Sequence, residues 1–86
     1  MLYTAKCFWP GVEETDIRLA AARAERSLGA TRFDGALYLP DDELILCLFD
    51  AVAPAAVKEA AERAGLPCER VIQTVWIAAN AKGASR

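Results

Sequence analysis

Three cysteines carry most of the chemistry that this sequence offers, because its 86 residues include no histidine. Cys7, Cys47 and Cys68 do not have the Cys-x-x-Cys spacing of zinc knuckles or thioredoxin-type redox pairs. The lack of histidine also removes the commonest general base and the commonest imidazole ligand for metals. No segment resembles a signal peptide. We therefore expect reduced thiols in a cytoplasmic protein.

Four side chains in the expected strands are candidates for binding a small ligand: Lys6, Asp34, Tyr38 and Cys47. A reactive thiol needs a nearby cation, and Lys6 is the only lysine in an expected strand. Aspartate is depleted in strands, so Asp34 is either a charge that protects a sheet edge or a binding group. The structural alternatives are that Cys47 is a small buried hydrophobe, Tyr38 a packed ring and Lys6 a side chain at the sheet margin.

The elements that must position these residues follow from hydrophobic periodicity and turn residues. Strands are expected at 2–9, 31–39, 43–50 and 69–77, and amphipathic helices at 14–28 and 54–64. The order βαββαβ predicts an α+β fold, the ferredoxin-like sandwich, with two helices on one face of a four-stranded antiparallel sheet. Residues 1–77 form its single domain, and residues 78–86 are expected to be a flexible C-terminal tail.

The two middle strands predict the register of a hairpin. A loop of two or four residues pairs Leu39 with Leu44, Leu37 with Leu46 and Gly35 with Leu48, and paired residues share a face. We assign one set to the core under the helices: Phe33, Gly35, Leu37, Leu39, Leu44, Leu46 and Leu48. The other set is expected on the open face: Asp34, Ala36, Tyr38, Ile45, Cys47 and Phe49.

The strand at 43–50 is apolar on both faces, although two helices can cover only one of them. We therefore expect a homodimer in which two sheets pack into a dimeric α+β barrel, with room for a small ligand on the open face. The core is also thin for a monomer, because 18 of the apolar residues are alanines.

Charge and hydropathy exclude two classes of partner. The net charge of −2 and the pI near 5.0 argue against nucleic acid, which selects for basic surfaces. The longest apolar run, residues 44–49, is far shorter than a membrane span of about 20 residues. We expect neither nucleic acid nor membrane as a partner.

Five segments in order carry a family resemblance: Trp9-Pro10-Gly11-Val12, Pro40-Asp41-Asp42-Glu43, Cys47-Leu48-Phe49-Asp50, Glu62-Arg63-Ala64-Gly65-Leu66-Pro67 and Arg70-Val71-Ile72. Together they resemble a family of small bacterial ferredoxin-like proteins, mostly of unknown function and sometimes called nickel-binding. The resemblance spans residues 3–77. It implies a dimeric α+β fold and a bound divalent metal such as nickel, although nickel favours nitrogen or thiolate donors and imidazole is absent here.

Two functional hypotheses follow. The first is a dimeric protein of unknown physiological role that binds a small ligand or metal on the open face of the sheet. The alternative is a small α+β-barrel enzyme, of the cyclase, isomerase or cofactor-free monooxygenase type, with Asp34 or Tyr38 as acid or base. The lack of histidine favours the first hypothesis.

Overall fold

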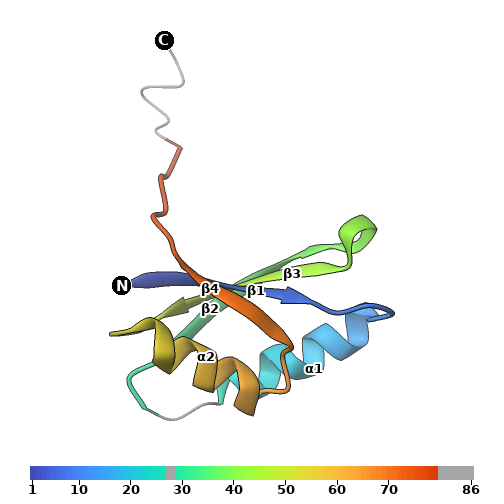
Figure 1. Ribbon diagram of the computed structural model, residues 1–86, viewed down its shortest axis with the longest axis horizontal. Helices are drawn as coiled ribbons and strands as arrows, with labels where there is room; N and C mark the ends of the chain where they lie inside the picture. Colours follow the sequence, from blue (N-terminus) through green and yellow to red (C-terminus); the bar gives the residue numbers. More distant parts are fainter. Residues whose placement is uncertain (27–28, 80–86) are drawn as a thin grey trace.

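The computed structural model describes residues 1–26 and 29–79 and has six main elements in the order βαββαβ (Figure 1). They are β1 (Leu2–Phe8), α1 (Glu14–Glu25), β2 (Arg32–Leu39), β3 (Leu44–Asp50), α2 (Pro54–Arg63) and β4 (Cys68–Gln73). A short 3₁₀ turn, Pro40–Asp42, joins β2 to β3. No helix among the described residues is long and apolar enough to cross a membrane.

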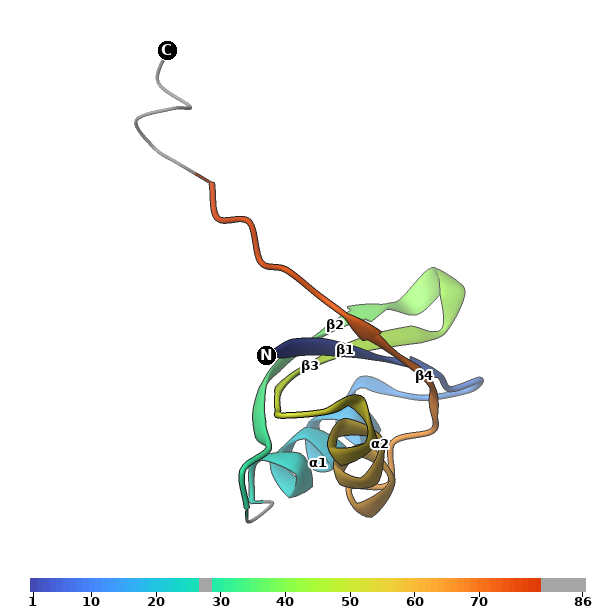
Figure 2. The same cartoon turned by 60° about the vertical axis from the view of Figure 1, so that its left-hand side comes forward.

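The four strands form one antiparallel sheet in the order β2-β3-β1-β4. Both helices lie on one face of this sheet, and its other face carries no layer from the described chain (Figures 1 and 2). The predicted ferredoxin-like α+β sandwich is therefore confirmed. The dimeric barrel stays a prediction.

Two elements end earlier than the sequence pattern indicates. The first helix ends at Glu25, and the expected last turn includes residues 27–28, which lie outside the described residues. The last strand ends at Gln73 instead of residue 77. The reason is its partner, β1, which begins at Leu2. The carbonyl of Leu2 accepts from the Thr74 amide at 3.0 Å, and beyond this point residues 1–26 and 29–79 offer no further strand to pair with. Most of the expected tail, residues 80–86, also lies outside the described residues.

Alanines make up much of the contact between helices and sheet. Val57 and Ile17 are the larger side chains that the helices bury, and alanines supply the rest of that layer. Small side chains let a helix lie close to the sheet, but they fill little volume. The buried residues form one cluster: Tyr3, Ala5, Cys7, Ile17, Ala20, Ala24, Ile45, Cys47, Phe49, Ala51, Val57, Ala60, Ala61, Ala64 and Leu66.

The hairpin register is as predicted, but the assignment of its faces is wrong. Leu39 pairs with Leu44, Leu37 with Leu46 and Gly35 with Leu48 across a four-residue loop. However, Ile45, Cys47 and Phe49 are the fully buried residues of β3, so this set packs under the helices. The leucines lie on the open face. The prediction failed because both sets are apolar; the polar residues of β1 mark the open face, since Lys6 pairs with Leu46 and Thr4 with Leu48.

A β-bulge in β2 explains why Phe33 does not follow the strand parity. Phe33 pairs with Phe49 and the next pair is Gly35 with Leu48, which leaves Asp34 as the extra residue. Gly35 has φ +139°, a backbone conformation that favours glycine. The bulge turns the Phe33 ring toward the helices, where it meets Phe49 edge-to-face with centroids 5.3 Å apart.

One arginine links the two helices. Arg23 of α1 donates its Nε–H to the carbonyl of Ala64, the C-terminal cap of α2, at 2.8 Å. A cation at this end of a helix also interacts favourably with the helix dipole. Gly65, with φ +81°, ends α2 next to this guanidinium.

We predict that Arg23→Met lowers the free energy of unfolding by about 1–2 kcal/mol, because it removes a hydrogen bond from a charged donor. Urea denaturation followed by circular dichroism measures the change. The matched control is Arg26→Met, at an exposed position just after α1, which should alter stability far less. Equal effects of the two substitutions would show that the Arg23–Ala64 contact is not stabilising.

Candidate functional site

The four candidate residues lie in three different places. Cys47 is 1% exposed in the core, and Tyr38 packs against the same core from β2. The expectation that both lie on the open face is therefore wrong. Lys6 does lie on that face, where it pairs with Leu46, so the sheet separates it from Cys47.

Asp34 lies in the bulge at the sheet edge and has a charged partner. Its Oδ1 accepts from Nε of Arg32 at 2.7 Å, and Arg32 also reaches Asp50 on β3 at 3.4 Å. These ion pairs hold the edge of the sheet at the bulge. They match the edge-charge interpretation of Asp34. Lys6 has a different partner, Glu69, whose Oε1 lies 3.8 Å from its ammonium.

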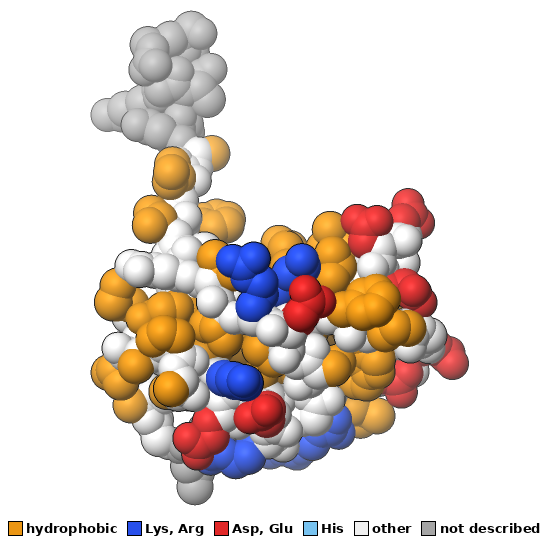
Figure 3. All heavy atoms as spheres, viewed as in Figure 1, with side chains coloured by type: hydrophobic (Ala, Val, Ile, Leu, Met, Phe, Trp, Pro, Cys, Tyr) orange, Lys and Arg blue, Asp and Glu red, His pale blue; other side chains and the backbone are white. Residues whose placement is uncertain are grey.

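The open face of the sheet is mainly apolar. Its larger apolar side chains come from all four strands: Leu2, Phe8, Leu37, Leu39, Leu44, Leu46, Leu48 and Ile72. Leu37 is 58% exposed and Phe8 46% exposed. Figure 3 shows basic side chains on the sheet side of the molecule with hydrophobic side chains beside them. A contiguous apolar surface of this kind marks an interaction site.

The three cysteines are free thiols and lie close together on the helix side of the sheet. Cys7 is Cys68's partner across β1 and β4, and it lies diagonally from Cys47 across β1 and β3. Hydrogen bonding with the Cys47 thiol, together with burial, raises the pKa of the Cys7 thiol far above its ordinary value. Burial likewise raises the pKa of Cys68. The thiols of Cys7 and Cys68 therefore stay protonated and are poor nucleophiles at neutral pH.

The donor set does not fit a nickel site within one subunit. The chain has no histidine, and residues 1–26 and 29–79 contain no group of three cysteine, aspartate or glutamate side chains arranged to hold a metal ion. Thiolates are the remaining strong donors for nickel. The raised pKa values of Cys7 and Cys68 oppose their ionisation, which a thiolate ligand requires.

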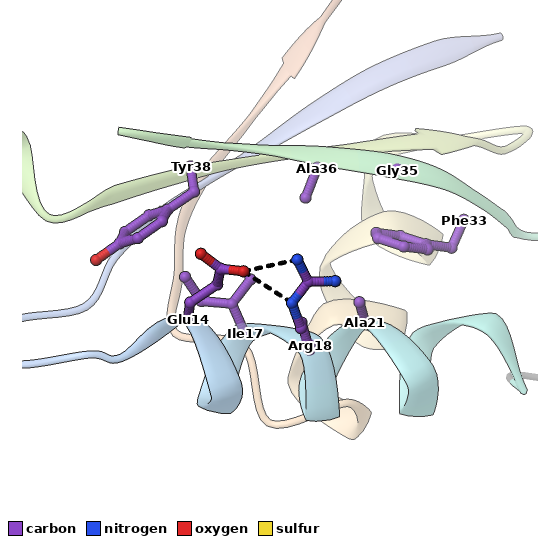
Figure 4. A pocket seen from close by; sticks show the side chains of 8 residues that line it. All are labelled: Glu14, Ile17, Arg18, Ala21, Phe33, Gly35, Ala36 and Tyr38. Atoms are coloured by element: carbon purple, nitrogen blue, oxygen red, sulfur yellow. Dashed lines mark hydrogen bonds and ion pairs between the residues drawn. The ribbon is translucent and has the colours of Figure 1, made fainter. Parts of the chain in front are cut away.

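A pocket of about 400 Å³ lies between α1 and β2, on the helix side of the sheet (Figure 4). This volume is within the range of small-molecule sites. Eight residues line the pocket: Glu14, Ile17, Arg18, Ala21, Phe33, Gly35, Ala36 and Tyr38. Of the four residues that the sequence singled out, the pocket contains Tyr38 alone.

The pocket exists because small residues stand where α1 faces β2. Ala21 on the helix and Ala36 on the strand leave the space between the two elements unfilled, and Gly35 lies beside Ala36 in the same wall. Two aromatic rings stand at either side of Ala36. The hydroxyl of Tyr38 donates to the carbonyl of Val12 at 3.4 Å, and Phe33 rests on Phe49, so both rings are held from outside the pocket.

An ion pair lies at the mouth of the pocket. Oε2 of Glu14 accepts from Nε and Nη2 of Arg18 at 2.9 and 2.6 Å, one helical turn apart on α1. Both side chains are largely exposed, so the pair is weak and can be exchanged for contacts with a ligand. Aromatic walls with a few polar groups at the rim suit a small amphipathic molecule.

Sequence reasoning missed Glu14, Arg18 and Phe33 as site residues. A pocket that arises from small residues leaves no recognisable motif in the sequence. The one available signal was the spacing of Glu14 and Arg18, which places them on the same side of α1.

Comparisons with known proteins agree with this fold. Residues 9–74 match the family model described as nickel responsive protein SCO4226-like. The crystal structure of SCO4226 from Streptomyces coelicolor A3(2) superposes with a TM-score of 0.68 and 18% sequence identity, covering 91% of this chain and all of that one. At this identity the superposition shows a shared fold. No curated protein is significantly similar in sequence.

We predict that the buried Cys7 thiol makes stability fall in alkali. Its pKa in the folded protein lies above the ordinary value of 9.0, so folding favours the protonated thiol. Its contribution is constant below pH 9, and is lost as the pH rises above 9, because only the unfolded chain then ionises. Urea denaturation at pH 7, 9 and 10 should show a steeper loss for the wild type than for Cys7→Ala. Parallel losses would contradict the assignment.

Proposed function

We propose that this chain, which belongs to the family of nickel responsive proteins that are SCO4226-like, is a homodimeric binding protein for a small organic ligand. The open face of the sheet forms the subunit interface, and the pocket between α1 and β2 takes the ligand. The observation that carries this proposal is the separation of the two surfaces: the apolar face and the pocket lie on opposite sides of the same sheet.

The apolar face supports the dimer. Burying a leucine side chain contributes roughly 1.5–3 kcal/mol, and this face offers leucines from three strands. A second copy of the chain presents the same apolar surface, and symmetric pairs are the commonest oligomers. The flanking polar groups of the face, Thr4, Lys6 and Arg70, lie toward β4 and leave the leucines of β2 and β3 as its apolar centre.

The polar side chains that could act as acid or base already have hydrogen-bond partners, which favours binding over catalysis. Asp34 is paired with Arg32, and the hydroxyl of Tyr38 donates to a backbone carbonyl. An acid or base would have to break one of these contacts. The pocket instead suits a molecule with a flat apolar body that lies against Phe33 and Tyr38, and with one polar group that meets Glu14 or Arg18.

Nickel enters only through the family description, and the donor set of the described residues does not match it. We therefore assign the ligand of the pocket to the class of small organic molecules.

We predict that Leu37→Glu dissociates the dimer without unfolding the subunit, because it places a charge on the exposed apolar face. Analytical ultracentrifugation at micromolar concentration should show a dimer for the wild type and a folded monomer for the variant. Leu19→Glu is the matched control, since Leu19 is 61% exposed on the outer side of α1, and it should remain a dimer. A monomeric wild type would contradict the dimer.

We predict that Ala36→Leu fills the pocket and abolishes ligand binding while the fold stays intact, because the new side chain occupies space that is open in the wild type. A thermal-shift screen of small aromatic acids, amines and nickel chloride measures binding, since a ligand of the folded state raises the melting temperature. Aromatic compounds should raise it and nickel should not.

The matched control is Ala55→Leu, at an exposed position of α2, which should respond to the same compounds as the wild type. The pocket assignment fails if no aromatic compound shifts the wild type, or if Ala36→Leu responds equally. A shift with nickel alone would show that the donor-set argument is wrong.

A further inference from the structure

The segment after β4 exposes three large apolar side chains in a row. Val75, Trp76 and Ile77 are 76%, 74% and 86% exposed. Three such residues in sequence are unusual on a surface unless something covers them. Valine, tryptophan and isoleucine are also residues that favour strands, although β1 offers no further partner here.

The start of this segment is held in a fixed direction. The Thr74 amide donates to the carbonyl of Leu2 at 3.0 Å, and its hydroxyl lies 2.6 Å from that of Thr4. From there the chain leaves the sheet on the side away from the helices (Figures 1 and 2). In Figure 3 hydrophobic side chains follow the part of the chain that rises from the body below the grey atoms. The segment therefore projects on the side of the open face.

Its length matches the thickness of a second layer. An extended chain advances about 3.3 Å per residue, so residues 75–77 span roughly 10 Å, which is the distance between two packed sheets. A second copy seated on the open face would therefore lie alongside the whole segment.

The open face alone is small for a stable dimer. Four strands spaced about 4.8 Å apart and seven residues long cover roughly 450 Å² in projection, whereas a standard interface buries about 800 Å² on each partner. One aromatic side chain can add about 150–250 Å². Residues 75–77 therefore supply about as much additional apolar area as the open face lacks for a standard interface.

For two sheets that stack about a two-fold axis parallel to their strands, the strand order predicts where the segment would meet the second copy. β4 and β2 are the two edges of the sheet. When two such sheets stack about a two-fold axis parallel to their strands, the β4 edge of one lies over the β2 edge of the other. An edge strand also has backbone groups that no neighbouring strand pairs.

We infer that residues 75–77 of each subunit cross to the other subunit and pack along its edge strand β2. This inference rests on the proposed dimer and adds a reciprocal exchange of C-terminal segments to it. Trp76 is the central contact, because it has the largest apolar surface of the three side chains.

Acrylamide quenching of tryptophan fluorescence tests the inference in the full-length chain. Trp9→Phe leaves Trp76 as the single indole. In this background Trp76 should be quenched several-fold less in the dimer than after the additional change Leu37→Glu, which separates the subunits. Sedimentation of the same samples records the oligomeric state independently.

The outcomes separate the two proposals. If the parent is a dimer and Trp76 is quenched equally in both proteins, the exchange is wrong and the dimer stands. Protection that persists in the Leu37→Glu monomer also overturns the exchange, because the contact would then lie within one subunit. A parent that is monomeric at all concentrations overturns both.

A second measurement uses affinity. Trp76→Ala should raise the dissociation constant of the dimer at least about tenfold, as expected for a buried tryptophan at an interface. Val52→Ala, at a position that is 78% exposed beside α2, is the matched control and should leave the constant unchanged. Equal constants for Trp76→Ala and the wild type would contradict the inference.

Discussion

The close packing of alanine-rich helices against one face of the sheet determines the rest of the structure. Ala20 and Ala24 of α1, with Ala60 and Ala61 of α2, are buried against the sheet. The residues that fit beneath them are Ile45, Cys47 and Phe49. The leucines of β2 and β3 are therefore left on the other face, where no layer of the described chain covers them.

Element order, topology and strand register could be predicted from the sequence because they depend on local signals. Proline and glycine mark the turns, and a four-residue loop pairs Leu39 with Leu44. The choice of face could not be predicted in the same way. Both sets of β3 residues are apolar, so the hydrophobicity of β3 alone does not distinguish them, and the decision depends on the neighbouring strand β1, whose Thr4 and Lys6 pair with Leu48 and Leu46. The bulge at Asp34 was hidden because no spacing rule marks an unpaired residue.

The candidate site shows the same limit more strongly. Tyr38 was recognised by its residue type, and it lines the pocket. Glu14 and Arg18 were not among the candidate residues, although they form the rim of the pocket. The pocket depends on the small volume of Ala21 and Ala36, and this becomes visible only after α1 is placed against β2. Cys47 and Lys6 come from neighbouring strands, but they lie on opposite faces of the sheet.

The pairing of β1 with β4 also has a consequence for the order in which the chain assembles. The hairpin of β2 and β3 closes a loop of four residues, whereas Tyr3 and Gln73 are about 70 residues apart in the chain. In an otherwise unfolded chain, loop-closure entropy makes the second pairing costlier by about 2.5 kcal/mol, so we expect β4 to join the sheet late. Thr74 gains its contacts with Leu2 and Thr4 only at that step. Until β1 and β4 have met, nothing holds the apolar end of the chain in one direction, so its projection is among the last features of the fold to form.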